Sequence, residues 1–243
     1  ICRVAIKSSE QQQLQMLHRI RTRLVKQRTE LINEVRGMLM EEGIVLAKTR
    51  VQFKKVVVDQ FGRLESKLEG QLRYVMSELI EEYQQLNERI EGYEKRIKRY
   101  FQQNEACQRI GKIEGIGYLS ATAIVAAVGH QAQGFKDSKH FSAWLGLTPR
   151  QHSSGGKTKI LGISKRGDSY IRQLLIHGAR NVVRWTNAKR GEKHVIEHPR
   201  RRWICKKTQE QMAFNKISVA YARKNARVVW KLLSSGEQYR YAA

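Results

Sequence analysis

Hydrophobic residues recur with helical spacing in the first part of the chain. Between about residues 8 and 42 they stand seven positions apart, at Leu17, Leu24, Leu31 and Met38. No proline interrupts this segment, Ser8 or Ser9 can cap its start, and Gly43 can end it. The pattern predicts one long helix.

Residues 63–103 carry a stronger pattern, in which most apolar positions alternate at spacings of four and three. These positions are Leu72, Leu79, Tyr83, Leu86, Ile90, Tyr93, Ile97 and Tyr100. Such a continuous seam is typical of a coiled coil or a long helical hairpin. We therefore expect the two helices to pack on each other or on a second subunit. The interspersed Glu, Lys and Arg side chains are interpreted as a solvated face.

Beyond residue 103 glycines become frequent and the periodic segments shorten, which indicates a compact domain with tight connections. Helices are predicted at about residues 117–128, 138–145, 168–186 and 208–234. The expected fold class is mainly α. A long antiparallel helical pair or coiled coil at residues 8–103 leads into a compact helical domain at residues 104–243.

Basic residues outnumber acidic ones, most strongly in the second half of the chain. The 243 residues include 46 Lys and Arg against 22 Asp and Glu, a net charge of +24. Residues 104–243 hold 26 basic and 8 acidic side chains, so this half is the better candidate for contact with phosphates. Nucleic acid is the usual polyanionic partner, but basic ribosomal and chromatin proteins share this balance, so charge alone names no function.

The cysteine positions and the hydropathy of the chain indicate the cellular compartment of the protein. Cys2, Cys107 and Cys205 are far apart and odd in number, which argues against a disulfide framework and fits a reducing cytosol. No apolar run approaches the ~18 residues that a membrane span requires, and there is no signal-peptide pattern. We expect a cytoplasmic protein with no membrane partner.

The first chemical motif is the stretch Ile113–Ile124, in which Gly115 and Gly117 flank Ile116. Two glycines around one apolar residue predict a tight hairpin, and a helix of small and aliphatic residues follows. The arrangement resembles the helix-hairpin-helix motif, in which backbone N–H groups at a helix N-terminus hold a DNA phosphate. DNA contact by these three residues is favoured, and an ordinary packing corner is the alternative.

The second motif, Phe141–Lys157, runs from an apolar segment into a polar loop that presents Ser153, Ser154 and two glycines. Its cationic neighbours are Arg150, His152 and Lys157. A serine hydroxyl needs activation to act as a nucleophile, and nearby cations would stabilise charge developing on an attacked phosphate. From composition alone, a flexible loop that merely touches phosphate is favoured.

The third motif, Gly162–Leu175, opens a further helix that Asp168 can cap. Lys165 and Arg166 lie just before its positive end, where the helix dipole favours an anion. Further along this helix, three arginines lie near one face: Arg172, Arg180 and Arg184. A phosphate-binding face is favoured over a solvated one.

Other residues point less clearly to a site. His194, His198 and Cys205 lack a fourth ligand at normal spacing, so zinc is not expected. The run Pro199–Trp203 is interpreted as a nucleic-acid contact rather than a structural element. The eight acidic residues of the basic half form no obvious cluster, so the sequence shows no carboxylate set of its own for metal-dependent phosphoryl transfer.

Four blocks together resemble the transposases of the insertion-sequence one-ten and eleven-eleven family. They are Gly115-Ile116-Gly117, Leu145-Gly146-Leu147-Thr148-Pro149, Ser153-Ser154-Gly155-Gly156-Lys157 and Ile163-Ser164-Lys165-Arg166-Gly167. The family is named for an N-terminal Asp-Glu-Asp-Asp domain with a ribonuclease-H-like fold, which precedes a C-terminal transposase domain. The resemblance covers nearly all of this chain. It implies that residues 104–243 are the transposase domain and that residues 1–7 end an acidic domain that this sequence does not include.

The resemblance implies DNA transposition and site-specific recombination guided by a structured RNA of the element. It also implies a composite site, in which acids of the N-terminal domain bind magnesium and a serine attacks DNA to give a phosphoserine intermediate. Counting from Pro149 points to Ser154, whereas counting back from Ile163 points to Ser153; we favour Ser154. A bacterial, nucleoid-associated protein that forms homo-oligomers through its coiled coil is expected.

Because the chain starts at Ile1 and carries no acidic domain, we expect a C-terminal fragment that is inactive alone. The competing hypothesis is a non-catalytic, basic DNA- or RNA-binding helix-hairpin-helix module. Positive charge, the glycine hairpin and a coiled coil would suffice for that function. Loss of strand cleavage on mutation of both serines would separate the two hypotheses.

Overall fold

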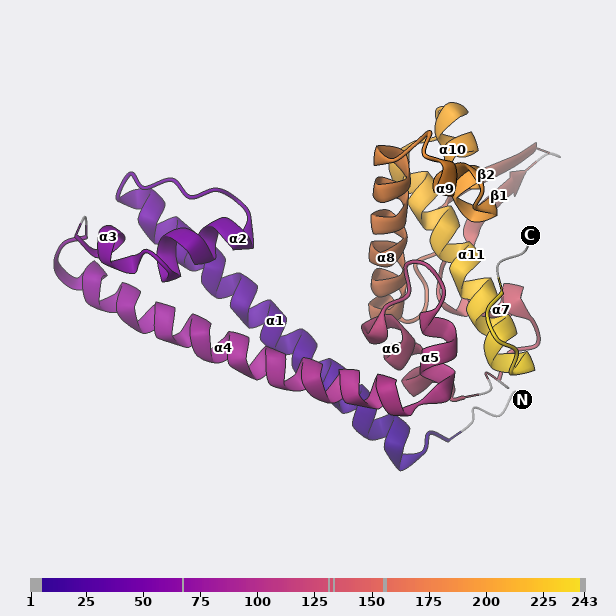
Figure 1. The fold of residues 1–243 in the computed structure, drawn as a ribbon, viewed down its shortest axis with the longest axis horizontal. Coiled ribbons are helices and arrows are strands. Elements are labelled where there is room, and N and C mark those ends of the chain that lie inside the picture. Colours follow the sequence, from indigo (N-terminus) through magenta and orange to yellow (C-terminus); the bar gives the residue numbers. More distant parts are fainter. Residues whose placement is uncertain (1–5, 67, 131, 133, 155–156, 241–243) are drawn as a thin grey trace. The chain divides into compact units, whose positions relative to one another are not determined.

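The computed structural model describes residues 6–66, 68–130, 132, 134–154 and 157–240 (Figure 1). The chain divides into two compact units, one formed by residues 16–96 and the other by residues up to 15 together with those from 97 onward. Both units are mainly helical, as the sequence predicts, and the β-structure among the described residues is a two-stranded sheet. Within these residues, no helix combines the length and apolarity that a membrane crossing requires.

Two long helices run antiparallel in the unit of residues 16–96. Helix α1 spans Ser9–Glu41 and helix α4 spans Gly70–Gln103. Arg21 Nε donates to Glu94 Oε1 at 2.8 Å, and Arg28 Nη1 donates to Asn87 Oδ1 at 2.8 Å. A later residue of α1 thus meets an earlier residue of α4, which is the antiparallel pairing expected from the sequence.

The apolar seam predicted from the sequence lies between these two helices. Of the predicted positions, Leu24, Leu31, Tyr83, Leu86 and Ile90 are buried here, whereas Leu72, Leu79 and Tyr93 are only partly buried. Residues that were not predicted complete the buried contact: Val35 and Leu39 of α1 and Met76 and Ile80 of α4. The seam of α4 is therefore covered by α1 of the same chain. Burial of these side chains removes apolar surface from water and stabilises the pair.

The segment that joins the two helices differs from the prediction. One helix was expected over residues 63–103, but a short helix ends at Glu65 and α4 begins at Gly70, where φ is +56°. The elements before α4 are α2 (Arg50–Phe53), the π-helical turn η1 (Lys54–Val58) and α3 (Phe61–Glu65). The Phe53 ring lies 5.2 Å from the Tyr83 ring, so this segment packs onto α4.

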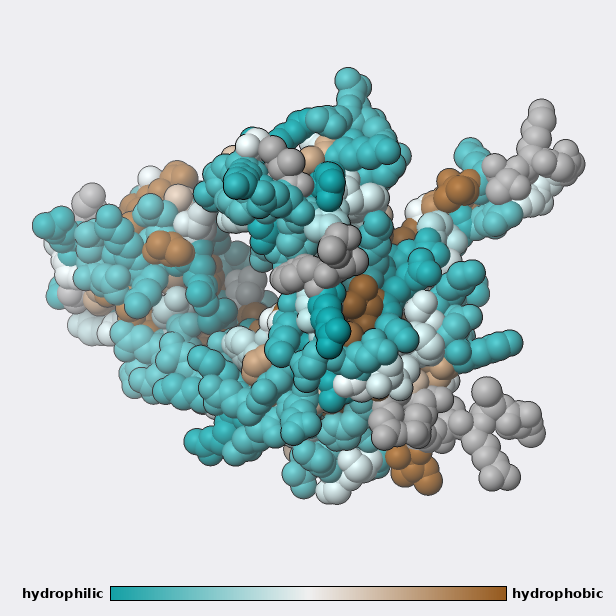
Figure 2. All heavy atoms as spheres, turned by 45° about the vertical axis from the view of Figure 1, so that its right-hand side comes forward, coloured by the Kyte–Doolittle hydropathy of each residue, from teal (hydrophilic) through white to brown (hydrophobic). Residues whose placement is uncertain are grey.

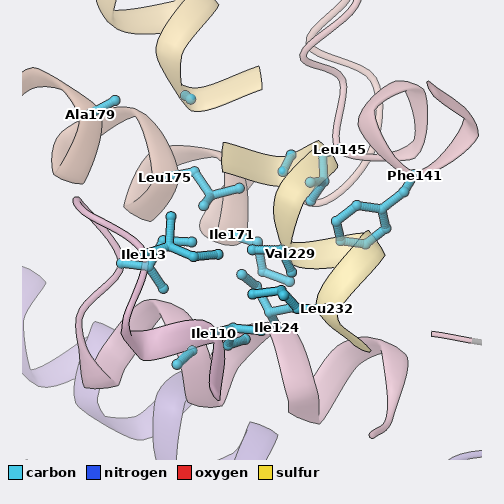
Figure 3. Close-up of a cluster of buried hydrophobic side chains, with 14 of the residues drawn as sticks. Ile110, Ile113, Ile124, Phe141, Leu145, Ile171, Leu175, Ala179, Val229 and Leu232 are labelled. Atoms are coloured by element: carbon cyan, nitrogen blue, oxygen red, sulfur yellow. The ribbon is translucent and has the colours of Figure 1, made fainter. Parts of the chain in front are cut away.

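Helix α11 is the centre of the other unit. The helices of this unit are α5 (Glu105–Gly111), α6 (Tyr118–Val128), α7 (Ser138–Trp144), α8 (Ser169–Ala188), α9 (Lys193–Ile196), α10 (Pro199–Gln209) and α11 (Phe214–Ser235). Helix α11 packs against α5, α7, α8 and α10. Figure 3 shows Ile124, Leu175 and Val229 converging in the resulting core, where all three are fully buried.

Three of the four short helices predicted for this unit are confirmed to within two residues, as α6, α7 and α8. The last predicted helix, over residues 208–234, corresponds to α11 and ends within one residue of the prediction, with Gly236 in a left-handed conformation just beyond it, but it begins six residues later than predicted. Helix α10 ends at Gln209 and α11 begins at Phe214. Between them Gln211 adopts a φ of +54°, a left-handed conformation that interrupts helical hydrogen bonding.

The polar loop expected after the second motif's apolar segment is instead one strand of a β-hairpin. Strand β1 (Pro149–Ser154) pairs antiparallel with β2 (Lys157–Ile163), with a register irregularity between Pro149 and Gln151. All six residues of β1 are exposed, so the strand lacks the alternation of buried and exposed positions by which strands are recognised. The expected loop glycines, Gly155 and Gly156, lie outside the described residues.

His18 makes the folded state sensitive to acid. Its side chain is buried, and burial, aided by the nearby charge of Arg21, lowers its pKa to about 4. The unfolded chain binds this proton near pH 6.5, so acid favours the unfolded state between these two values. We expect this residue alone to reduce the free energy of unfolding by about 2 kcal/mol between pH 7 and pH 5.

Urea denaturation followed by circular dichroism at the two pH values measures this loss. His18→Gln should abolish most of it, whereas the matched change His177→Gln, at an exposed position, should leave it intact. An equal pH dependence in the wild type and His18→Gln would show that His18 does not carry the effect.

Candidate nucleic-acid interface

The β-hairpin presents its two serines on opposite faces. Alternate residues of a strand point to opposite sides, and directly opposed residues of an antiparallel pair share a side. His152 stands opposite Lys159, so Ser154 lies on the same side as these two basic side chains. Ser153 lies on the other side, where its Oγ accepts a hydrogen bond from Gln151 Nε2 at 3.0 Å. Ser154 is therefore the serine placed beside positive charge.

The cations predicted around the serines are at the surface. Arg150, His152, Lys165 and Arg166 are exposed. Lys165 has a φ of +57°, and its N–H donates to the Gly146 carbonyl at 3.1 Å, which fixes the turn after β2. The side chain of Lys157, also predicted to contact DNA, lies outside the described residues, although its backbone pairs with Ser154 in the hairpin. The described cations leave their charged ends available to a phosphate.

Helix α8 starts as predicted, but its three arginines differ from one another in their contacts. Asp168 caps the helix by accepting from Ile171 N at 2.9 Å. Arg172 Nη1 donates to the Leu145 carbonyl at 3.2 Å, and the Arg180 guanidinium lies 5.7 Å from the centre of the Phe214 ring. Arg184 is exposed. Arg184 is thus the most accessible of the three, while Arg172 and Arg180 also support the packing.

The glycine hairpin lies between α5 and α6. Gly115 has a φ of +86° and contacts the backbone of Gly178 on α8 so closely that a Cβ on Gly178 would overlap the Gly115 carbonyl oxygen. Gly117 is the residue before α6, has a φ of −90°, and a Cβ there would meet open space. Close packing therefore accounts for Gly115, whereas no packing contact requires a glycine at 117.

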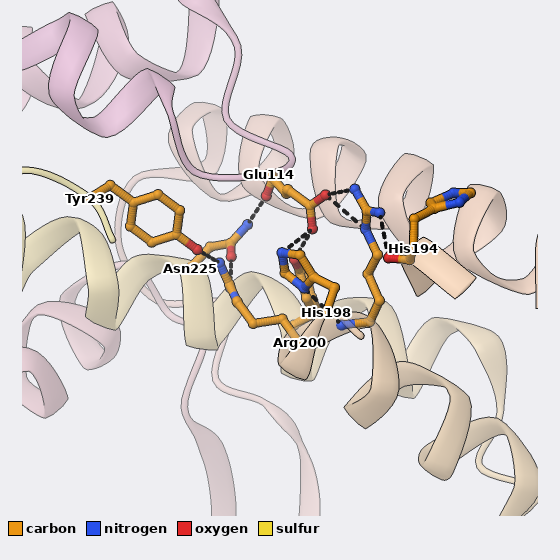
Figure 4. A network of polar contacts seen from close by, with 8 residues as sticks. Glu114, His194, His198, Arg200, Asn225 and Tyr239 are labelled. Carbon is orange, nitrogen blue, oxygen red and sulfur yellow. Dashed lines mark hydrogen bonds and ion pairs between the residues drawn. The ribbon is translucent and has the colours of Figure 1, made fainter. Parts of the chain in front are cut away.

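A polar network holds this hairpin in place (Figure 4). The Glu114 carboxylate accepts two hydrogen bonds from the Arg201 guanidinium, and His198 Nε2 lies 3.7 Å from its Oε2. Asn225 Nδ2 donates to the Glu114 carbonyl at 2.9 Å, and Asn225 Oδ1 accepts from Arg200. The turn is thereby tied to α10 and α11. Burial lowers the pKa of His198 against the opposing effect of the Glu114 charge.

The arginine run at residues 199–203 is therefore a structural element, contrary to the sequence interpretation. It forms the first turn of α10, and two of its arginines, Arg200 and Arg201, belong to the Glu114 network. The residues considered for zinc are also placed apart, since His194 pairs with Glu192 while His198 faces Glu114. Across the described residues, no three His, Cys, Asp or Glu side chains gather as metal ligands.

One basic surface was missed by the sequence reasoning. Helix α11 carries Lys216, Arg223 and Arg227 at positions i, i+7 and i+11, on the side that faces the β-hairpin across a groove. The helical spacing of these residues, in a helix without a single acidic residue, was the available signal. The predicted helix over residues 208–234 contained all three residues, so this signal did not depend on where the helix begins.

Comparison with known proteins places these features among transposases. Residues 107–195 match the model of the Transposase IS116/IS110/IS902 family. The chain is 42% identical over 238 residues to a probable family 20 transposase of Pseudomonas aeruginosa, covering 98% of this chain and 68% of that protein. It is 41% identical over 237 residues to the transposase for insertion sequence element IS1111A of Coxiella burnetii, covering 98% and 63%.

A third relative is the transposase for insertion sequence element IS1328 of Yersinia enterocolitica. It is 30% identical over 233 residues, with 96% of this chain and 66% of that protein covered. The chain thus spans about two thirds of the length of these relatives.

The two hairpin glycines provide a test of phosphate contact against packing. Gly115→Ala should lower the free energy of unfolding by about 1–3 kcal/mol, because of its positive φ and the close approach to Gly178. Gly117→Ala should change it by less than about 0.5 kcal/mol, since its Cβ meets open space. If backbone N–H groups beside Gly117 hold a phosphate, the added methyl group should weaken DNA binding. Urea denaturation and fluorescence anisotropy measure the two effects, and unchanged DNA affinity in Gly117→Ala would favour the packing corner.

Proposed function

The chain belongs to the IS116/IS110/IS902 family of transposases, and we propose that it acts in DNA transposition by binding DNA and attacking a strand with Ser154. The observation that carries this proposal is the placement of Ser154. It is exposed near the end of a projecting strand, on the same side as His152 and Lys159. Ser153 has the opposite orientation and a hydrogen bond to Gln151, which makes it the less suitable nucleophile.

In the proposed step, Ser154 Oγ attacks a backbone phosphorus and forms a phosphoserine ester to the 5′ phosphate. The bond between that phosphorus and the neighbouring 3′ oxygen breaks, and the serine proton passes, in the net reaction, to that oxygen to give a 3′ hydroxyl. One phosphodiester replaces another, so strands can be exchanged and resealed without ATP. The nearby cations His152 (when protonated) and Lys159 stabilise the charge that develops on the phosphate oxygens.

Magnesium chemistry is not assigned to the described residues, because they provide no cluster of ligands for a metal ion. The proposal is that the acids which hold magnesium come from an Asp-Glu-Asp-Asp domain of the whole transposase. This chain's own contribution would then be the nucleophile and the DNA-binding surface. In the absence of that domain, binding without cleavage is expected.

The partners implied by the family resemblance belong to the same proposal. DNA contact is supported by the net charge of +24. A structured RNA of the element, together with the self-association through residues 63–103 that the apolar seam predicts, would complete an assembly that acts in the nucleoid. The seam of α4 is already covered by α1, so any self-association would use the outer surface of the helical pair. A purely DNA- or RNA-binding module is the second candidate, favoured by the scattered carboxylates.

The test uses a transposase in which this sequence is joined to the family's acidic domain, together with a nicked suicide DNA substrate. A covalent protein–DNA adduct should appear on a denaturing gel. Ser154→Ala should abolish it and leave DNA affinity within about twofold, because the hydroxyl contributes little to binding. Ser153→Ala is the matched control and should retain the adduct.

Two outcomes would contradict this assignment. Loss of the adduct only in Ser153→Ala would move the nucleophile by one residue to the other face of the strand. An adduct that persists in the double variant would place the nucleophile elsewhere and leave the hairpin as a phosphate contact.

A further inference from the structure

A groove of about 1120 Å³ separates the β-hairpin from α11. Its apolar lining residues are Leu147, Ile160, Leu161, Ile163, Met212 and Val219. Ile160 and Leu161 are unusual in being 73% and 38% exposed on a strand that packs on no second sheet. In Figure 2 the hairpin projects as an arm that bears hydrophobic, brown spheres among hydrophilic, teal ones. Apolar side chains that gather in one groove, rather than lying scattered over the surface, are typical of a binding site.

Both walls of the groove carry positive charge. Arg150 and Lys165 come from the hairpin side, and Lys216, Arg223 and Arg227 come from α11. On α11 the three residues lie seven and four positions apart, which places them along one face of the helix.

These charges are not neutralised by the protein. In the described part of the chain, none of the five forms an ion pair, and α11 contains basic but no acidic residues. Arg223 Nε is buried and has no hydrogen-bond partner there. The neighbouring Lys224 has its pKa lowered by burial first and then by Arg200, Lys207 and Arg227, which shows a local excess of cations. An anionic ligand would relieve this repulsion.

We propose that this groove binds a single strand of DNA, with phosphates on the rim cations and bases against the apolar lining. The proposal rests on the function proposed above and specifies the form of its substrate. In a duplex the bases are stacked inside and paired, so the apolar lining would have nothing to contact. An unpaired strand offers base faces, which bind apolar side chains and the planes of arginine guanidinium groups.

The groove and the nucleophile share one element. Strand β2 contributes Ile160, Leu161 and Ile163 to the lining, and it pairs with β1, which carries Ser154 near its end. Ile160 stands opposite Gln151 and so lies on the Ser153 side of the hairpin, which means that a strand bound against Ile160 would have to pass round the hairpin edge to reach Ser154. Strand exchange requires an unpaired end to be held while it moves from one partner to another, and the groove supplies that hold.

The test measures binding of a fluorescent oligonucleotide of about 12 nucleotides to the chain by anisotropy. Single-stranded DNA, the corresponding duplex and an RNA of the same sequence are compared over a range of salt concentrations. Lys216→Gln with Arg227→Gln removes two exposed rim cations. Lys206→Gln with Lys231→Gln removes two exposed cations outside the groove and serves as the control.

The rim variant should bind the single strand at least about tenfold more weakly than the wild type. The slope of the logarithm of its binding constant against the logarithm of the salt concentration should be smaller by about 1.4, as expected for two lost phosphate contacts. The control variant should lose less than about threefold. Ile160 is 73% exposed, so Ile160→Ser should not change the stability of the fold. The variant should bind the single strand about fivefold or more weakly and bind the duplex as tightly as the wild type does.

Equal losses in the rim and control variants would overturn the groove assignment. Duplex DNA bound as tightly as the single strand, with Ile160→Ser affecting neither, would overturn the assignment to a single strand. Tighter binding of RNA than of DNA would overturn the choice of DNA. These outcomes are independent of the serine adduct, because groove binding is measured without cleavage and Ser154→Ala does not alter the groove.

Discussion

The Glu114 carboxylate is the contact on which the arrangement of the compact unit depends, because it joins the glycine turn to α10 and α11. Its side chain is only 16% exposed, and a carboxylate at that depth needs a charged partner, which Arg201 supplies. Removing one partner of such a pair leaves a buried charge, at a cost of about 3–5 kcal/mol. The position of Gly117 in front of α6, and hence of the N–H groups that could face DNA, follows from this pairing.

The basic residues of this unit fall into two groups with different consequences. Arg200 and Arg201 are used to build the fold, since each has a polar partner inside the unit. Lys216 and Arg227 on α11 have no acidic partner among the described residues, and neither has Arg150 on the hairpin. Charges of the second kind repel one another and reduce stability in the free protein. Such an arrangement is sustained when a polyanion neutralises it, so the unpaired group is the better guide to the binding surface.

Helical periodicity predicted the larger elements well, and local backbone geometry explains where it failed. The 3.6-residue pattern located α1 and α8, because each buries one apolar face. Helix α6 is buried on all sides over residues 120–126 and was recognised instead from the glycines before it and from its small and aliphatic residues. The 3.6-residue pattern could not show that Gln211 adopts a left-handed φ, so the start of α11 was predicted six residues too early. For the candidate site, the hairpin glycines were singled out from their residue types, whereas the serine nucleophile was predicted only from the family resemblance, because composition alone favoured a loop that touches phosphate. The roles of Arg200 and Arg201 were not recognised, because their partners are distant in sequence: Arg200 donates to Asn225, 25 positions away, and Arg201 to Glu114, 87 positions away.

The β-hairpin that carries Ser154 is stabilised differently from the helices beneath it. Every residue of β1 is exposed, and an isolated two-stranded ribbon is only marginally stable in water. Its backbone hydrogen bonds can therefore open at little free-energy cost, while those of α11 open only when the whole unit unfolds. In terms of amide hydrogen exchange, Ser154 belongs to a weakly protected element and α11 to a strongly protected one. A side chain on this hairpin can thus shift its position without disturbing the core.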